Sequence, residues 1–369
     1  DSMRGMVTGD SDKFLYPNQN DNEASNNYLK LTPTGFQLQN AHDQVNTANE
    51  RYTYIAIRRS DGYVQKPVKD ATKVFAIDGA GDSGSTPAFD SNFVVDAALL
   101  KVPTTTSNWM LTSRLTGDKH QVTNGNDTQN NNSKHVWDNN VGWGDGWDNT
   151  YDSWMWKRTA GFDVVNYTGN AAEPHAIAHN LSVPPEMIWV KNRSTARSWW
   201  AGHKGLNGGT NPWNYGWHLN DREKPVEDTA RFYSTTPTST HFFVGNSNRV
   251  NANNDEYIAY LFASVTGISS VGSFTGGSGS AVTVTTGFQP RFLFVKNYDE
   301  PATNASNAAF IFDTVRGWSS GNDQQLDLSN SAAQIGTVDY GAPTSTGFTL
   351  AANTNMNNGS DRYIYYAHA

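Results

Sequence analysis

The sequence predicts an all-β protein, a tandem array of β-sandwich, jelly-roll-like repeat domains with short turns and little helix. Three observations lead to this prediction. Short phrases recur along the chain in a fixed order, which is the signature of an internal repeat. Short runs of β-branched and aromatic residues alternate with Gly and Asn, as strands alternate with turns. Only 17% of the 369 residues are charged, so long helices stabilised by charge pairs are not expected.

The repeat divides the chain into four units. An apolar phrase that ends in Arg-Gly occurs at 311–317, and a related phrase opens the chain at 1–5. The phrases that follow also match, and aligning them gives units at 1–59, 60–159, 160–266 and 267–369, of which the second is a divergent copy. Units of about 100 residues have the size of a small β-sandwich.

Each complete unit is expected to contain the same elements in the same order. A strand with a Gly-rich turn comes first, then an apolar strand that ends in Lys, then the phrase with its basic residue, and finally an aromatic closing strand. Several runs are continuously apolar, which is typical of central strands in a packed sandwich. The first strands are predicted at 74–77, 162–165 and 271–274, the Lys-ended strands at 97–101, 187–192 and 292–297, the phrase at 109–115, 199–205 and 310–317, and the closing strands at 153–156, 257–262 and 363–366.

The first unit is only a partial sandwich, because it lacks counterparts of the first strand and of the Lys-ended strand. Its sheet would be missing central members, and open strand edges are costly. Either the full protein extends N-terminally beyond Asp1, or a neighbouring chain supplies the missing strands. We expect the upstream extension.

Composition excludes several classes of function. The net charge of −8 disfavours nucleic acid, since phosphate binding needs a surplus of Lys and Arg on one face. The absence of Cys removes disulfides, thiolate metal sites and cysteine nucleophiles. No apolar run has membrane-spanning length, so membrane insertion is not expected.

Two catalytic interpretations are weaker than their structural alternatives. The stretch 81–85 resembles the nucleophile loop of chymotrypsin-like serine proteases, but only His42 precedes Ser83, and the other units carry a Gly-rich turn at the same place. The acid pairs of a glycosidase could come from Asp145 with Asp148 or from 255–256, yet both lie in Asn/Gly stretches typical of turns. We therefore expect no enzymatic activity.

Metal binding is considered for calcium and zinc. Asp78, Asp82, Asp145 and Asp148 offer oxygen ligands for Ca²⁺ in Gly-rich loops, but without the spacing of a recognised calcium loop, so turns capped by their own side chains are favoured. His175 and His179 are the only close histidine pair and lack a third ligand for Zn²⁺. No other cofactor is expected.

Two further groups of residues recur or cluster. Trp143, Trp147, Trp213 and Trp217 lie outside the strand phrases, and either they bind a ligand such as a sugar or they fill the core and the joints between units. A basic residue ends the phrase in all four units, as Arg4, Arg114, Lys204 and Arg316. We expect these basic side chains to pair with a nearby carboxylate or carbonyl and to fix the turn.

Segments 161–170, 184–193 and 313–317 resemble a repeat family in virion proteins of marine tailed bacteriophages, and 70–78 with 153–158 looks like a divergent copy. Lys204 departs from the pattern, because the Asp-x-x-Arg-Gly motif is lost at 202–205. The resemblance implies a non-enzymatic structural protein of the virion surface or tail, such as a tail fibre, another appendage or an adhesin. It implies as partners other virion proteins or copies of the chain itself, with a trimer as one option, and a glycan of the host surface. The alternative is a secreted carbohydrate-binding array or polysaccharide-degrading enzyme of a marine bacterium.

Overall fold

The computed structural model describes residue 6 and residues 11–32, 34–57, 68–81, 84–299, 308–352 and 354–369. The regular structure of these residues is almost entirely β, which confirms the predicted all-β class. The described part of the chain contains one α-helix, α1 (Thr229–Phe232), and short 3-10 turns at Ala71–Lys73, Arg114–Thr116, Leu206–Gly209 and Pro212–Asn214. None of its helices is long and apolar enough to cross a membrane.

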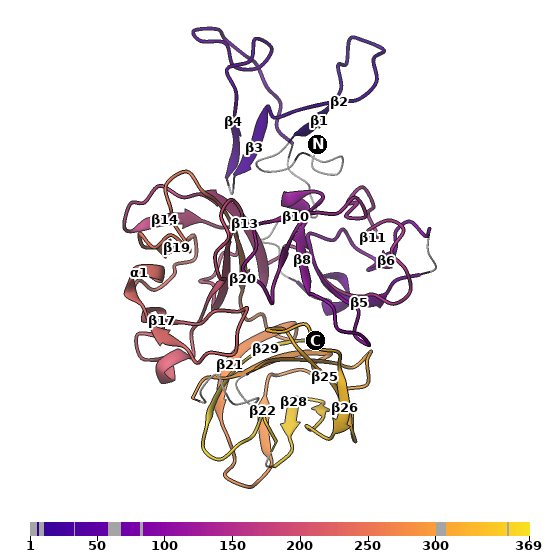
Figure 1. The fold of residues 1–369 in the computed structure, drawn as a ribbon, viewed down its shortest axis with the longest axis vertical. Helices are drawn as coiled ribbons and strands as arrows, with labels where there is room; N and C mark the ends of the chain where they lie inside the picture. The colour runs from indigo at the N-terminus through magenta and orange to yellow at the C-terminus, as the bar shows by residue number, and fades with distance from the viewer. Residues whose placement is uncertain are drawn as a thin grey trace.

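Three lobes form the body of the molecule, and each takes its strands from one stretch of the chain (Figure 1). Lobe two contains β5 (Phe75–Gly79), β6 (Phe89–Asp90), β7 (Ala97–Lys101), β8 (Met110–Ser113), β9 (Lys119–Val122), β10 (Asn130–Asn131), β11 (Gly142–Trp143) and β12 (Asp152–Trp156). Lobe three contains β13 (Phe162–Thr168), β14 (His175–Ala178), β15 (Met187–Asn192), β16 (Trp200–His203), β17 (Tyr215–Gly216), β18 (Val226–Glu227), β19 (His241–Val244) and β20 (Glu256–Phe262). Lobe four contains β21 (Ser269–Thr275), β22 (Val282–Thr285), β23 (Phe292–Asn297), β24 (Ala309–Asp313), β25 (Asp323–Asp327), β26 (Ile335–Val338), β27 (Pro343–Thr344), β28 (Gly347–Leu350) and β29 (Arg362–His368).

The largest sheet of each lobe has the same antiparallel strand order. The first strand, the closing strand, the Lys-ended strand and the phrase strand lie side by side as β5-β12-β7-β8, β13-β20-β15-β16 and β21-β29-β23-β24. Lobes two and four extend this order with further strands, β9-β10 and β25-β26. The recurring phrases therefore correspond to recurring positions in a sheet.

A smaller second sheet completes each lobe. It is formed by β6-β11 in lobe two, by β14-β19 in lobe three and by β22-β28-β27 in lobe four. Between the two sheets lies a core specific to the lobe, built around Phe89 and Trp143, around Phe242 and Val190, and around Phe348 and Phe310, respectively.

The opposite faces of the three large sheets meet in one common core at the centre of the molecule. This core joins residues such as Trp154 of lobe two, Tyr260 of lobe three and Tyr366 of lobe four, all at most 1% exposed. Alternate residues of a strand therefore face two different cores: on β15, Trp189 belongs to the common core and Val190 to that of lobe three. This double burial explains the continuously apolar runs. It also packs the three lobes around one centre (Figure 1).

Equivalent hydrogen bonds recur between the lobes. Trp109 and Trp199 each precede the phrase strand of their lobe, and their indole Nε1 atoms donate to the carbonyls of Asp327 and Val122, the last residues of β25 and β9. The lysines that end β7 and β15 behave likewise, because Lys101 Nζ donates to the Ser331 carbonyl and Lys191 Nζ to the Asn126 carbonyl of the neighbouring lobe. The contact of lobe two with lobe four therefore uses the same two kinds of hydrogen bond as the contact of lobe three with lobe two.

The first unit forms an arm (residues 11–57) that projects from the three lobes (Figure 1). It contains two strand pairs, β1 (Asp12–Phe14) with β2 (Ala24–Asn26) and β3 (Leu29–Thr32) with β4 (Gly35–Leu38). The buried Lys30 connects the arm to lobe three, with its Nζ 2.5 Å from Glu256 Oε1 and 2.5 Å from Thr168 Oγ1.

Candidate functional site

The four tryptophans considered as sugar-binding residues are buried. The exposed fraction is 0% for Trp143, 2% for Trp147, 4% for Trp213 and 1% for Trp217. The ring of Trp143, for example, stacks on Phe89 and on Trp137, with ring centroids 5.6 and 4.7 Å apart. An aromatic face that is covered by protein cannot stack on a sugar. The structure therefore corrects the binding interpretation, since Trp143, Trp147 and Trp213 fill the cores of their lobes and Trp217 belongs to the common core.

The basic residues of the phrase pair with carboxylates and carbonyls. Arg114 donates from Nε and Nη2 to the Val95 carbonyl, at 3.0 and 2.6 Å, and its Nε lies 3.6 Å from Asp96 Oδ1. Lys204 Nζ lies 2.6 Å from Glu186 Oε1, and Arg316 Nε donates to Asp313 Oδ2 at 2.7 Å. Arg4 lies outside the described residues.

The strand register corrects one part of the alignment. Ser113, His203 and Asp313 occupy equivalent positions, because each pairs with the first residue of its Lys-ended strand. Arg114 and Lys204 directly follow this position, whereas Arg316 comes three residues after it. Arg316 therefore has a different place in its lobe, although it performs the same type of pairing.

The calcium candidates are engaged in local hydrogen bonds. Asp78 Oδ2 accepts from the backbone N–H of Asp90 at 2.7 Å, and Asp145 Oδ1 accepts from Thr86 Oγ1 at 2.5 Å. Asp148 caps its own turn by accepting from the backbone N–H of Thr150 at 3.1 Å. Asp82 and Ser83 lie outside the described residues. Among the described residues, no metal-binding group of three or more His, Cys, Asp or Glu side chains includes Asp78, Asp145 or Asp148.

The two histidines of the close pair have different hydrogen-bond partners, and so do the two residues of the acid pair at 255–256. His175 Nδ1 contacts Asn251 Oδ1 at 2.9 Å, while His179 Nε2 contacts the Thr238 carbonyl at 3.1 Å. In the acid pair, Asp255 accepts from the Asn192 amide, and Glu256 forms the ion pair with Lys30. These contacts give each side chain a structural role of its own.

A polar cleft of about 400 Å³ lies between lobes two and four, a volume typical of sites for small ligands. Its side chains are amides, hydroxyls, a carboxyl and a guanidinium, together with one proline, and they are Pro103, Thr104, Asn149, Thr150, Asp152, Arg316, Gln324 and Gln334. Because the lining comes from both lobes, the cleft exists only when the lobes are packed together. Its chemistry suits a ligand rich in hydroxyl groups, which would bind through hydrogen bonds.

Asp152, the carboxyl that lines the cleft, and Asp313, the buried partner of Arg316, have different environments. Burial raises the pKa of Asp152 to about 6, and the charges of Asp313 and Asp78 act in the same direction while Arg316 opposes them. Asp313 is fully buried and saturated, because its Oδ2 accepts from Arg316 Nε and from Trp154 Nε1 at 3.0 Å, and its Oδ1 from the Arg316 backbone N–H. Asp152 is thus the carboxyl that remains available to a ligand in the cleft.

A model of a protein family, described as a domain of unknown function (DUF7483), matches residues 81–369. The match spans most of the chain and includes nearly all of lobe two and the whole of lobes three and four. The chain belongs to the DUF7483 family. Among curated proteins, no sequence matches it.

All residues that line the cleft lie within the DUF7483 region. Sequence reasoning singled out Arg316, as a structural residue, and missed the other lining residues. They come from separate repeats, so no local pattern connects Asn149 with Gln324. Sequence reasoning also missed a group in lobe three, His218 with Asp221 and Glu223, although three potential ligands within six residues were a visible signal.

Proposed function

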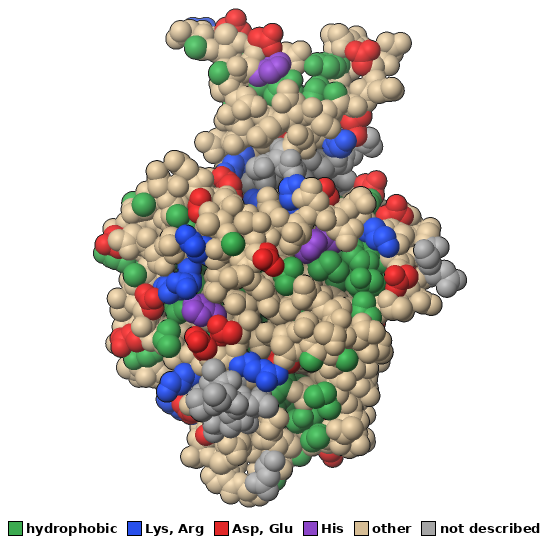
Figure 2. All heavy atoms as spheres, viewed as in Figure 1, with side chains coloured by type: hydrophobic (Ala, Val, Ile, Leu, Met, Phe, Trp, Pro, Cys, Tyr) green, Lys and Arg blue, Asp and Glu red, His purple; other side chains and the backbone are tan. Residues whose placement is uncertain are grey.

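We propose that the chain is a non-enzymatic structural protein of a phage virion, a tail-fibre or other appendage component that assembles through its first repeat. The resemblance of its phrases to virion repeat proteins supports this proposal. The surface supports it too, since Figure 2 shows charged side chains scattered over a face made mostly of neutral polar groups and backbone. The observation that carries the proposal is an exposed apolar segment in the arm.

This segment, residues 52–57, is the first unit's copy of the closing strand. It aligns with residues 363–368 in β29, where Tyr365 is 5% and Tyr366 1% exposed. In the arm the corresponding Tyr54 and Ile55 are 75% and 89% exposed, and Ile57 is 90% exposed. Burying such side chains is favourable by about 1.5–3 kcal/mol each. The segment therefore has the sequence of a buried strand, but its apolar side chains are exposed.

The equivalent strand in lobe four indicates which elements would cover this segment. In lobe four, β29 is hydrogen-bonded to β21 on one side and to β23 on the other. The described residues of the arm form only the pairs β1-β2 and β3-β4, and neither pair includes residues 52–57. We infer that a neighbouring polypeptide of the particle contributes flanking strands to this segment, in place of the upstream extension expected from the sequence. In this form of recognition, main-chain hydrogen bonds add a strand to an open edge, as suits a component that assembles with other chains.

The test is incorporation into particles. The variant Ile55→Asp/Ile57→Asp should fold with an unchanged melting temperature and lose its place in purified particles. Val315→Asp is the matched control, because Val315 is also 64% exposed but lies in a turn of lobe four. Equal incorporation of both variants, or photo-cross-links from position 55 that reach only the same polypeptide, would contradict assembly through the arm.

The cleft between lobes two and four supports a second part of the proposal, attachment to a host-surface glycan. A glycan array should show binding by the wild type that weakens at least about tenfold in Gln324→Ala and Asn149→Ala, the loss of one or two hydrogen bonds to a ligand. Gln19→Ala in the arm should bind like the wild type. Depolymerisation of host polysaccharide by the purified chain would instead favour the alternative of a bacterial polysaccharide-degrading enzyme.

A further inference from the structure

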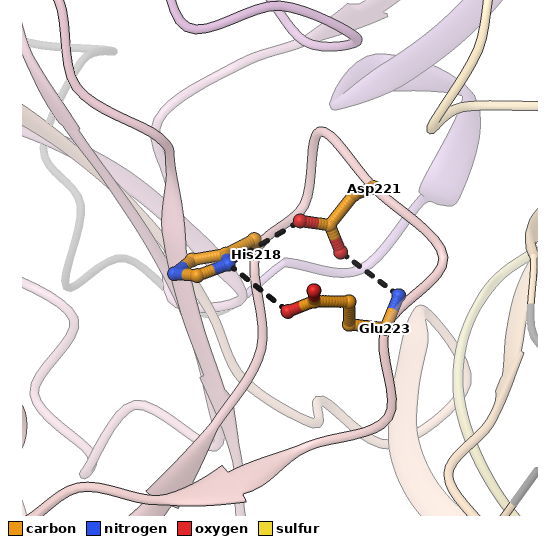
Figure 3. Close-up of side chains that lie close together, drawn as sticks. All are labelled: His218, Asp221 and Glu223. Carbon is orange, nitrogen blue, oxygen red and sulfur yellow. Dashed lines mark hydrogen bonds and ion pairs between the residues drawn. The ribbon is translucent and has the colours of Figure 1, made fainter. Parts of the chain in front are cut away.

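The loop between β17 and β18 in lobe three brings a histidine and two carboxylates together (Figure 3). His218 Nδ1 lies 3.3 Å from Asp221 Oδ2 and 3.6 Å from Glu223 Oε2. One donor atom from each residue lies within 4.8 Å of the other two. Figure 3 shows both carboxylates pointing toward the same nitrogen of the imidazole ring.

The backbone of the loop fixes this arrangement. The N–H of Asp221 donates to the carbonyl of His218 at 3.2 Å, which closes a turn. The N–H of Glu223 then donates to Asp221 Oδ1 at 2.8 Å, so the second oxygen of Asp221 is the one that faces the histidine. Because β17 and β18 are paired, both ends of the loop are anchored in a sheet.

Packing against a buried tryptophan also holds the imidazole in its orientation. Its ring lies edge to face against buried Trp200, with the centroids 5.5 Å apart and the planes at 66°. Nε2 is buried without a hydrogen-bond partner, so Nδ1 is the nitrogen that the ring presents to Asp221 and Glu223. A ring that is held in place before a ligand arrives loses little freedom on binding.

The geometry matches a small divalent cation. Zn²⁺ binds imidazole nitrogen and carboxylate oxygen at about 2.0–2.2 Å, which places tetrahedral ligands about 3.3–3.5 Å apart. The separations of 3.3 and 3.6 Å from Nδ1 agree with two of these edges, and the third separation, between the two carboxylate oxygens, is at most 4.8 Å. The side chains are 18%, 33% and 58% exposed for His218, Asp221 and Glu223, so a fourth position is open to water. The imidazole ligand favours a transition metal over Ca²⁺, which prefers oxygen.

We propose that His218, Asp221 and Glu223 bind a divalent transition-metal cation, with Zn²⁺ as the fitting example, and that this cation stabilises the contact between lobes three and four. Arg222 lies between two of the ligands in the sequence, and its side chain reaches across to lobe four. Its Nε and Nη2 donate to Asp327 Oδ2 at 2.9 and 2.7 Å. A cation that fixes Asp221 and Glu223 also fixes the backbone that carries Arg222, and thereby holds the interlobe ion pair.

Isothermal titration of the purified full chain with Zn²⁺ tests the site. We expect one Zn²⁺ per chain, with Ca²⁺ binding much more weakly, and an affinity at least about tenfold lower in His218→Gln and in Glu223→Gln, since even outer-shell changes cost that much. Glu223 is largely exposed, so Glu223→Gln keeps the fold intact. The matched control is His42→Gln, because His42 Nδ1 also contacts a carboxylate, Asp43 Oδ1 at 2.9 Å, and no third ligand joins this pair among the residues that the structure describes. Absence of binding, or equal affinity in all three variants, would overturn the proposal.

Thermal unfolding tests the coupling to lobe four. Zn²⁺ should raise the melting temperature of the wild type, as any ligand of the folded state does. In Arg222→Gln the titration should still show one bound Zn²⁺, but the rise should be smaller because the ion pair with Asp327 is gone. An equal rise in both proteins would overturn the stabilising role.

Discussion

The ion pair between Arg316 and Asp313 should contribute strongly to stability, because both side chains are buried. Asp313 is 0% and Arg316 5% exposed, and Nε lies 2.7 Å from Oδ2. The guanidinium also lies over the ring of Trp154 in lobe two, 5.2 Å from its centroid. Arg316→Ala leaves the carboxylate buried without its cation, and removing one partner of such a pair costs about 3–5 kcal/mol. Urea unfolding followed by tryptophan fluorescence measures this loss.

Arg362→Ala is the matched control in the same lobe. Arg362 pairs with Asp299 at 2.6 Å, but the two side chains are 45% and 27% exposed. An exposed pair contributes about 0–1 kcal/mol, so this variant should lose much less stability. The double variant Asp313→Asn/Arg316→Met should recover part of the loss of Arg316→Ala, because no charge is then left unpaired. Equal losses in Arg316→Ala and Arg362→Ala would refute the reasoning from burial.

Three further predictions concern pH, the arm and the tryptophans. Burial lowers the pKa of five of the described histidines from 6.5: to about 4 for His120, to about 3 for His135, His203 and His368, and in the same direction for His179. The unfolded chain therefore takes up protons first as the pH falls below 6.5, and the free energy of unfolding should fall toward pH 4 by up to about 1.4 kcal/mol per pH unit for each histidine. The raised pKa of Asp152 stabilises the folded state as the pH falls, but this single group should not outweigh the histidines. A urea midpoint that does not fall from pH 7.5 to pH 4.5 would contradict the prediction. Lys30→Met should remove the ion pair with Glu256 and speed proteolysis of the arm, whereas the exposed Lys13→Met should not. Trp143→Ala should lower the free energy of unfolding by about 3–5 kcal/mol, because it empties part of the core. If the variant instead lost glycan binding while its urea midpoint stayed unchanged, the assignment of Trp143 to the core would be contradicted.

The fold class followed from the sequence because strand patterns are local. Each Lys-ended strand was expected where β7, β15 and β23 lie, since a continuous apolar run states directly that both faces are buried. The same apolar run does not indicate which core each face of the strand packs against. Trp189 and Val190 are both apolar, yet Trp189 faces the common core and Val190 faces the core of lobe three. The common core is therefore a tertiary property that the repeat alone did not reveal.

The candidate sites were harder to predict than the fold. Trp143 and Trp213 looked like loop residues because they lie outside the repeated phrases. Both indoles are nevertheless buried in the cores of their lobes, Trp143 from strand β11 of the second sheet and Trp213 from a 3-10 turn. The cleft could not be foreseen, since Asp152 and Gln324 meet only through the packing of two lobes. The group at His218 was within reach of sequence reasoning, because its ligands lie in one short loop.

The proposed role in a virion is tested most directly by a cryo-EM reconstruction of the intact particle. The proposal predicts a three-lobed body at symmetry-related positions on the particle surface, with residues 52–57 paired to strands of a neighbouring polypeptide. A particle without this density, or residues 52–57 covered only by the same polypeptide, would contradict it.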